Sequence, residues 1–466
     1  MKRILFMAIA ASVLATNCRK IEVDDNGTTN NSGGNTSDTY VLSGRYNADK
    51  SLEAGKTYTL KGTVYITDGA KLTIPAGTTI KAEKTSRGTL VITRGSQILA
   101  NGTADKPVVF TSDQATPQRG DWGGIVLLGR ARTNASFNGT AGVGEIEGGI
   151  NNAEGLGLYG GADDNDNSGV LKFVRVEYAG YAFLPDKELN GLTFGAVGRG
   201  TVVDHVQVSY ANDDSFEWFG GTVDARYLIA YKGLDDDFDT DNGYSGRVQF
   251  AIGFRDSTIA DISGSNGFES DNDANGSSQA PQTSPIFSNV TLVGPRATLT
   301  SVGNSNYKRG MHIRRNSALS LHNSIVMGWP TGWLLDGSTG TPTDLNLVGS
   351  SPKAAVCNTI FAGNNTQFSY AASTSSPTGW ASADVLAYFT RANGGNTVLT
   401  NAADAGLVAP FKYDASVDFN PATGSAAANG ADFTNARLAG GFFTSTSYRG
   451  AASVGDTWWK GWTDFK

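Results

Sequence analysis

Three short runs of alternating residues decide the fold of this sequence: Val206-Gln-Val-Ser-Tyr210, Tyr227-Leu-Ile-Ala-Tyr231 and Val248-Gln-Phe-Ala-Ile252. They begin 21 residues apart. A fourth run, Val290-Thr-Leu292, begins 84 residues after the first, which is four such steps. Alternation over so few residues is typical of short strands, and a constant step is typical of stacked repeats.

A step of about 21 residues, with three short strands per turn, predicts a right-handed parallel β-helix. One coil cannot bury its apolar side chains alone, so neighbouring coils stack and share a continuous core. A propeller blade needs roughly 40–45 residues, so a β-propeller is a minor alternative, and an array of β-sandwiches is another. The predicted fold class is therefore all-β, a solenoid with a C-terminal cap.

The repeat also divides the chain into regions. We expect N-terminal β-helix coils over residues 40–115 and the main β-helix, with acidic loops, over residues 116–370. The period is lost in residues 371–466, where Ser382–Tyr388 suggests a short helix. We expect this last region to cap the open edge of the final coil, because an exposed strand edge promotes aggregation.

The N-terminus has the features of an export signal. Lys2 and Arg3 precede an apolar run, Ile4–Leu14, which is too short to span a bilayer. Cys18 follows this run, so we expect a signal peptide over residues 1–17 and a lipid on Cys18. The alternative is an ordinary signal peptide cleaved nearby. Residues 18–39 are mostly polar and predict a flexible tether, which would hold the folded part of the chain off a membrane surface. The acidic cluster of Glu22, Asp24 and Asp25 resembles the export signals of surface lipoproteins in Bacteroidota-type bacteria, and this resemblance implies an outer-membrane lipoprotein at the cell surface.

The composition excludes several classes of protein. The 466 residues carry a net charge of −7, which argues against a nucleic-acid partner. Two cysteines exclude a disulfide-rich scaffold, and we expect Cys357 to be a buried thiol. The 59 glycines suit a chain that turns at the corners of every coil.

Several motifs resemble those of a known family. They are Gly102–Ser112, Gly120-Asp-Trp-Gly-Gly124, Tyr448-Arg-Gly450 and Trp459-Lys-Gly-Trp-Thr463. With the repeat, they resemble the secreted or surface β-helix lipoproteins of Bacteroidota-type bacteria, within the pectin-lyase-like superfamily of right-handed β-helices. The resemblance implies the fold and the location, and it leaves the activity undefined.

Acidic residues recur at one phase of successive coils, in Asp213-Asp-Ser-Phe-Glu217, Asp236-Asp-Phe-Asp239 and Gly267-Phe-Glu-Ser-Asp271. Residues one coil apart stack ~4.8 Å from each other. We therefore expect Phe216 and Phe238 to form an inward ladder, with the carboxylates in a strip outside. Like charges at this spacing repel, so the strip predicts a counter-ion.

Alternating oxygen ligands before a glycine favour calcium as that ion. The candidate metal ligands are Asp164, Asp166, Asp237, Asp239, Asp241, Asp271, Asp273 and Asn275. These loops are not EF-hands, because position twelve counted from Asp271 is Gln282 rather than Glu. The alternative interpretation is a set of solvated Asp and Asn turns.

A polysaccharide lyase or glycoside hydrolase would use the same acidic residues. An inverting hydrolase needs two carboxylates ~6.5–9.5 Å apart, and a lyase needs calcium and a base. The catalytic candidates are Asp213, Asp214, Asp236, Asp237, His312 and Arg314. No sequence of the polygalacturonase type accompanies them, and fold alone does not imply function.

The function that we expect is a binding scaffold at the cell surface, without enzymatic activity. It would bind a polysaccharide or a protein, with calcium stabilising the acidic loops. Trp329 and Trp333 lie in Gly-rich sequence and are candidates for ligand binding, whereas Trp458, Trp459 and Trp462 are expected to cap the solenoid. The alternatives are the lyase or hydrolase and an accessory subunit of an outer-membrane uptake or secretion complex.

Overall fold

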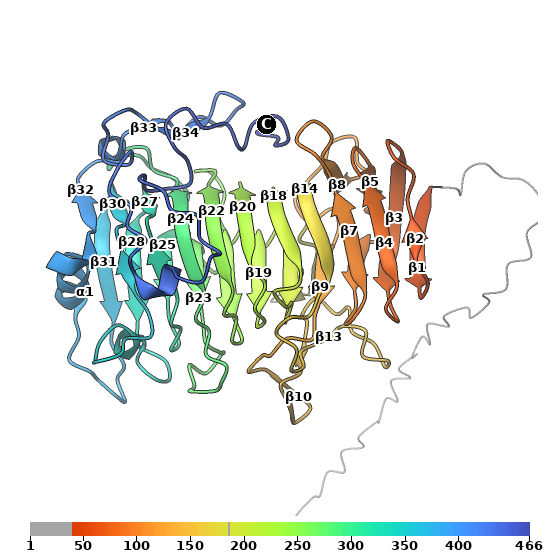
Figure 1. The fold of residues 1–466 in the computed structure, drawn as a ribbon, viewed down its shortest axis with the longest axis horizontal. Helices are drawn as coiled ribbons and strands as arrows, with labels where there is room; N and C mark the ends of the chain where they lie inside the picture. The colour runs from red at the N-terminus through yellow and green to blue at the C-terminus, as the bar shows by residue number, and fades with distance from the viewer. Residues whose placement is uncertain (1–39, 185–186) are drawn as a thin grey trace, which may run out of the picture. The chain divides into compact units, whose positions relative to one another are not determined.

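Parallel pairing between successive coils builds the fold. The computed structural model describes residues 40–184 and 187–466, and its largest sheet joins 26 strands. The strands follow one another along the long axis of the described region (Figure 1). The right-handed parallel β-helix predicted from the repeat is confirmed. The predicted signal peptide, Cys18 and tether lie outside the described residues.

The coils present three faces. Face 1 contains β2 (Lys50–Ser51), β4 (Lys71–Pro75), β7 (Gln97–Asn101), the first halves of β14 (Gly169–Glu177), β18 (Val202–Ser209), β20 (Ala225–Tyr231), β22 (Arg247–Phe254) and β24 (Ile286–Val293), then β26 (Ser320–His322) and β29 (Val356–Cys357). Face 2 contains the first halves of β1 (Val41–Tyr46) and β3 (Thr57–Ile66), β5 (Thr79–Ala82), β8 (Val108–Ser112), the second halves of β14, β18, β20, β22 and β24, then β27 (Ile325–Met327), β30 (Ile360–Ala362) and β32 (Thr397–Leu399). Face 3 contains the second halves of β1 and β3, β6 (Thr89–Ile92), β9 (Gly124–Leu128), β17 (Leu192–Gly195), β19 (Phe216–Phe219), β21 (Phe238–Asp241), β23 (Ser265–Ser270), β25 (Tyr307–Ile313), β28 (Thr331–Asp336) and β31 (Thr366–Ala371).

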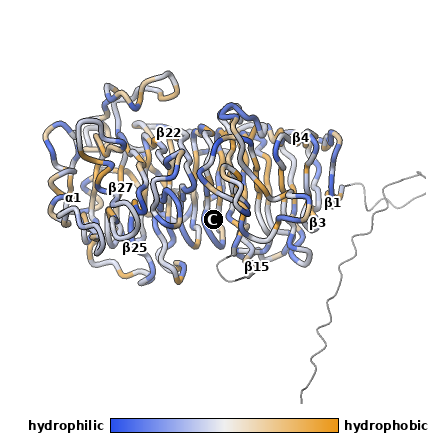
Figure 2. The backbone as a smooth tube through the Cα atoms, turned by 90° about the horizontal axis from the view of Figure 1, so that it is seen from below, coloured by the Kyte–Doolittle hydropathy of each residue, from blue (hydrophilic) through white to orange (hydrophobic). Residues whose placement is uncertain are grey.

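The core is a set of ladders, one residue per coil. On face 3, Phe216 pairs with Phe238 and Phe238 with Phe268, with ring centroids 5.7 and 5.5 Å apart. All three side chains are fully buried, so the predicted inward aromatic ladder is confirmed. Hydrophobic and hydrophilic stretches are interspersed along the coils (Figure 2), and strands such as β9, which is buried along its whole length, are apolar on both sides.

An insertion between β9 and β17 covers the outer side of the first coils of face 3. It consists of two segments, one before and one after β14, with the short strands β10 (Ser136–Phe137), β11 (Thr140–Ala141), β12 (Gly144–Glu145), β13 (Leu158–Tyr159), β15 (Ala182–Leu184) and β16 (Lys187–Glu188). Ile146, Tyr159 and Leu189 of the insertion pack on the outward side chains of Val126 and Leu128. The outer side of face 3 is therefore covered up to β17.

The C-terminal region has two parts. The predicted helix is confirmed as α1 (Ser382–Phe389), which packs on the last strand of face 3, β31. Residues 402–466, here called the strap, include β33 (Leu407–Ala409) and β34 (Asp418–Pro421) and run back over the outer side of face 2 (Figure 1). There Trp459 and Phe465 pack against outward apolar residues such as Ile229, Ile252 and Ile325.

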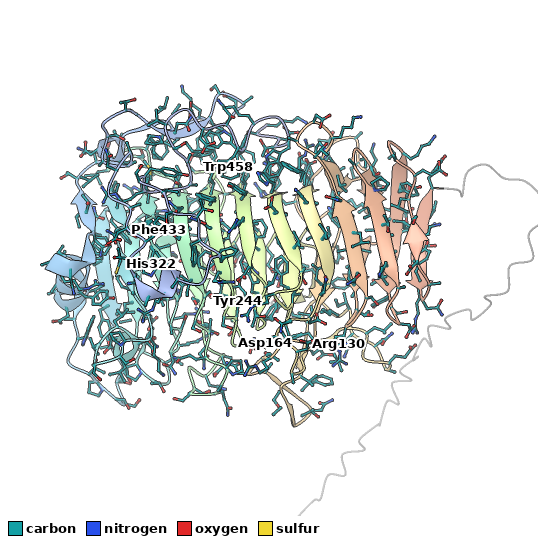
Figure 3. The ribbon with its side chains drawn as sticks, viewed as in Figure 1. Arg130, Asp164, Tyr244, His322, Phe433 and Trp458 are labelled. Atoms are coloured by element: carbon teal, nitrogen blue, oxygen red, sulfur yellow. The ribbon has the colours of Figure 1, made fainter. Side chains whose placement is uncertain are left out.

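Buried side-chain amides hold the strap in place. Gln207 donates to the carbonyl of Asp464 at 2.8 Å and accepts from its N–H at 2.9 Å. Gln249 makes the same pair of bonds with Thr444, at 2.7 and 2.8 Å, and Asn323 binds the strap likewise farther along. Trp458 lies on this strap rather than at the end of the solenoid (Figure 3).

Candidate functional site

The outward ladder of face 3 becomes acidic where the insertion ends. Glu217, Asp239 and Glu269 occupy equivalent positions on β19, β21 and β23, each one residue after the inward phenylalanine. The next residue of this ladder is His312, on β25. The acidic strip expected from the sequence therefore exists, and it extends along three coils.

The turns that lead into these strands bring in further carboxylates. Asp213 and Asp214 precede β19, and Asp235 and Asp236 precede β21. Asp214 Oδ1 accepts a hydrogen bond from the N–H of Asp236 at 2.8 Å, which joins the two turns. Asp214 and Asp236 are 7% and 4% exposed.

These residues line a cavity of about 350 Å3 that we call the acidic pocket. One wall comes from the insertion, through Glu147 and Glu188, and another from the loop that carries Asp261 and Ile262. Seven carboxylates line the pocket: Glu147, Glu188, Asp213, Asp214, Glu217, Asp235 and Asp261. None of the lining side chains that the structure describes is a lysine, an arginine or a histidine.

The carboxylates strongly perturb one another's protonation. Burial raises the pKa of Asp214 well above its usual range, and the charges of Asp213 and Asp236 raise it further. Burial and the charge of Glu188 raise the pKa of Glu147 to about 7. An environment that disfavours so many negative charges binds protons or cations.

Three overlapping groups of carboxylates are spaced for a metal ion, with their ligand oxygens within 4.8 Å of one another. They are Asp213 with Asp214 and Asp235, Asp214 with Glu217 and Asp239, and Asp236 with Asp239 and Glu269. Oxygen ligands of this kind suit calcium or another hard cation.

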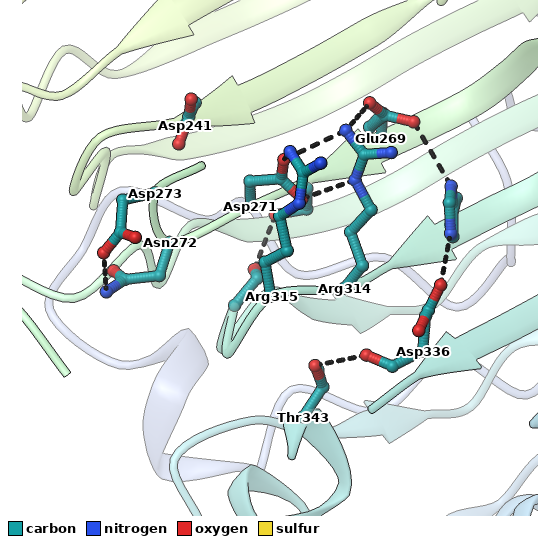
Figure 4. Close-up of polar contacts among 12 residues, drawn as sticks. Asp241, Glu269, Asp271, Asn272, Asp273, Arg314, Arg315, Asp336 and Thr343 are labelled. Carbon is teal, nitrogen blue, oxygen red and sulfur yellow. Dashed lines mark hydrogen bonds and ion pairs between the residues drawn. The ribbon is translucent and has the colours of Figure 1, made fainter. Parts of the chain in front are cut away.

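A basic cluster neutralises the far end of the strip (Figure 4). His312 lies between Glu269 and Asp336, with each nitrogen–oxygen distance at 3.2 Å. Arg314 forms ion pairs with both Glu269 and Asp271. Although burial opposes it, the hydrogen bond from His312 and the charge of Arg314 lower the pKa of Glu269.

Most of the sequence-predicted metal ligands have other partners. Asp237 forms a fully buried ion pair with Arg255 at 2.7 Å. Asp271 accepts from Arg314 and Arg315, both at 2.7 Å. Asp241 accepts from the N–H and the side-chain amide of its neighbour Asn242. Of the candidate ligands between Asp237 and Asn275, only Asp239 belongs to one of the three groups of carboxylates.

The remaining predicted ligands also differ from expectation. Asp164 forms a salt bridge with Arg132. Asp273 caps its own turn by accepting from the N–H groups of Asn275 and Ser277 at 2.9 and 3.1 Å. Asp166 is buried but belongs to none of the carboxylate groups among the described residues. Asp273 thus forms an Asx turn, as in the alternative interpretation, whereas Asp164, Asp237 and Asp271 are ion-paired.

The catalytic candidates divide in the same way. Asp213 and Asp214 line the acidic pocket, and Asp236 lies beside them because its N–H donates to Asp214 Oδ1. Asp237 instead forms an ion pair with Arg255. His312 is only 5% exposed, and Arg314 forms an ion pair with Asp271. A base must approach its substrate, so the structure does not favour these last residues as bases.

Trp329 and Trp333 are not available to a ligand. They are 0% and 1% exposed, and Trp333 occupies the inward ladder through its pairing with Met311. Gly332, which lies between them and suggested a loop, instead allows close packing, because a Cβ at this position would lie 2.7 Å from the Phe361 ring. Cys357 is a buried, free thiol as predicted.

Several pocket residues were missed by the sequence analysis. Asp235 adjoins a run that had been singled out, so the repeat could have identified it. Glu147, Glu188 and Asp261 come from an insertion and a loop that have no period, and only the folded chain brings them to face 3.

The observed architecture is a parallel β-helix with an acidic pocket on face 3. The chain belongs to the family of pectate-lyase-like β-helix domains, because the family model described as "Pectate-lyase like beta helix domain" matches residues 44–463. Searches of the curated proteins and of the solved structures found no match. The membership confirms the resemblance to the pectin-lyase-like superfamily.

Proposed function

We propose that this protein is a lipoprotein of the outer membrane that binds a polysaccharide along face 3 with the help of calcium. The observation that carries the proposal is the acidic pocket, where seven carboxylates line one cavity of about 350 Å3. A concave site with converging polar groups is the usual form of a ligand-binding site. The family supplies a polysaccharide-related scaffold.

Calcium explains how such a pocket would hold a sugar polymer. Carboxylates alone would repel an acidic glycan, whereas a bound cation offers open coordination positions to hydroxyl or carboxylate oxygens. Binding should therefore be lost when the cation is removed. The alternative ligand is a protein. Binding to a panel of purified glycans separates the two classes of ligand, because a scaffold that binds only a protein should bind none of the glycans.

The test is binding of the protein to a panel of acidic and neutral polysaccharides, with calcium and with a chelator. We expect binding in calcium that falls at least tenfold in chelator and in Asp214→Asn. Asp273→Asn is the matched control, because Asp273 lies outside the pocket and caps its own turn. Equal binding by the two variants, or no binding to any glycan, contradicts the proposal.

A glycoside hydrolase is the second candidate, supported by the carboxyl of Glu147. Burial and Glu188 raise its pKa to about 7, and a general acid needs a pKa near the working pH. Release of reducing ends from a bound glycan, lost in Glu147→Gln, would favour the enzyme. Binding without release of product supports the scaffold.

The membrane anchor is a separate part of the proposal. None of the helices in the described part of the chain is long and apolar enough to cross a membrane. Anchoring by Cys18 predicts that the protein incorporates labelled palmitate and sediments with membranes. Cys18→Ser should abolish both, and unchanged sedimentation of this variant would contradict lipid anchoring.

A further inference from the structure

Two of the carboxylate groups on face 3 share one residue, Asp214. The first triad is Asp213, Asp214 and Asp235, and the second is Asp214, Glu217 and Asp239. Within each triad the ligand oxygens lie within 4.8 Å of one another. Two oxygens bound to one calcium at 2.3–2.6 Å can be at most about 5 Å apart, so each triad has the dimensions of a single ion site.

The carboxylates of these two triads are not paired with cationic side chains in the described part of the chain. Among the described residues, no salt bridge involves Asp213, Asp214, Glu217, Asp235 or Asp239. The third group is different, because its Glu269 is paired with His312 and Arg314. At one end of the strip the protein therefore supplies a cationic partner, whereas the described carboxylates of the two triads form no ion pair.

Three buried oxygen atoms at or beside these triads have no hydrogen-bond donor. Asn190 is 1% exposed, and its Nδ2 donates to Glu217, so the amide faces the second triad. Its Oδ1 has no hydrogen-bond partner, and neither have Oδ1 of Asp235 and Oδ1 of Asp239. A buried oxygen without a donor costs free energy, and a bound cation removes that cost.

We infer that two divalent cations bind side by side in these triads, with Asp214 bridging them. Oxygen-only ligands select hard cations, of which calcium tolerates the irregular geometry best. Two such ions supply four positive charges against the five carboxylates of the triads. The inference deepens the proposed function by giving its calcium a location and a stoichiometry, and it rests on that function only for the identity of the ion.

The test is calorimetric titration of calcium chloride into the full mature chain, stripped of metal beforehand. We expect two ions per chain. Asp213→Asn should leave one ion by removing a ligand of the first triad, and Glu217→Gln should leave one by removing a ligand of the second. Asp214→Asn should weaken both sites at least tenfold, and Asp273→Asn should keep two ions with unchanged affinity.

Circular dichroism in chelator shows whether each variant is folded. If Asp214→Asn does not fold, the contrast between Asp213→Asn and Glu217→Gln decides the matter by itself. One ion or none in the unaltered chain overturns the inference, as do two ions in all the variants. Because no glycan is present in the titration, two ions without glycan binding would contradict only the proposed function, and calcium-dependent glycan binding with a single bound ion would contradict only this inference.

Discussion

Arg255 Nη1 lies 2.7 Å from Asp237 Oδ1, and both side chains are completely buried. Arg255 also stacks 5.2 Å from the centre of the Tyr307 ring. Gly253 leaves space for the carboxylate, since a Cβ there would lie 2.5 Å from Asp237 Oδ2. Burial raises the pKa of Asp237 to about 6, while Arg255 opposes the rise. This pair is therefore structural, although Asp237 lies next to the acidic strip in sequence.

Arg255→Met should destabilise the protein strongly, because it leaves Asp237 as a buried charge without a partner. Breaking a buried ion pair from one side costs about 3–5 kcal/mol. The double variant Arg255→Met with Asp237→Leu should recover much of this loss, because neither charge remains. Urea unfolding of the three proteins measures the difference. A single variant within 1 kcal/mol of the unaltered chain would show that the pair contributes little.

The register of the coils shows how far sequence alone could reach. Sequence spacing aligned Val206 with Tyr227 and Val248, whereas the structure pairs Val206 with Leu228 and Leu228 with Ala251. The difference arises at the corner between faces 1 and 2. His205, Tyr227 and Phe250 have φ values of 56°, 57° and 63° there, and the sequence analysis read Tyr227 and Phe250 as strand residues. The predicted fold is unaffected, because the steps from Val206 to Leu228 and from Leu228 to Ala251 are only one or two residues longer than the expected 21.

The site was predictable only where it follows the repeat. Glu217, Asp239 and Glu269 each follow an inward phenylalanine, so their stacking could be inferred from the sequence. The partners of a carboxylate could not be inferred. An aspartate can pair with Arg255, cap its own turn or lie beside another carboxylate. Contacts between distant segments decide which of these occurs, and the spacing of Asp residues along the sequence does not predict those contacts.

His322 should make the protein sensitive to acid. Its side chain is fully buried, and burial, with the charges of Arg437 and Arg391, lowers its pKa from 6.5 to about 3. Below pH 6.5 the unfolded state binds a proton that the folded state does not bind, so stability falls as the pH falls toward 3. This effect amounts to about 2 kcal/mol at pH 5.

Guanidinium unfolding of the unaltered chain and of His322→Gln between pH 7 and pH 4 measures this effect. The free energy of unfolding should fall more steeply with acid in the unaltered chain, because the other titrating groups are common to both proteins. Parallel pH profiles would show that His322 does not titrate between the two states.

Trp329 should matter for stability and not for ligand binding. Its ring is fully buried and lies edge-to-face with Tyr307, with centroids 6.3 Å apart. Trp329→Ala should cost about 3–5 kcal/mol, as large cavities in cores do. Trp329→Phe keeps most of the volume and should bind any glycan ligand with unchanged affinity. Weaker binding by a stably folded Trp329→Phe would contradict the core assignment.

The strap should be required for solubility, because it covers the one apolar outer surface of face 2. Ile229, Ile252 and Ile325 are each 0% exposed, yet they point away from the core of the coils and are covered by the strap. Removal of residues 402–466 would expose them as a continuous patch, and large exposed apolar patches promote association. We expect this truncated chain to aggregate, as measured by light scattering.

A point variant tests the strap without removing it. Trp462 is fully buried and lies 5.6 Å from the His205 ring, edge to face, so Trp462→Ala should cost about 3–5 kcal/mol. Lys460→Ala, at an exposed position two residues earlier, is the control and should cost less than 0.5 kcal/mol. If Trp462→Ala loosens only the strap, hydrogen exchange should increase in the strap and in the outer amides of face 2 while the inward ladder stays protected. Equal stability of the two variants would mean that the amide contacts of Gln207, Gln249 and Asn323 are sufficient to hold the strap.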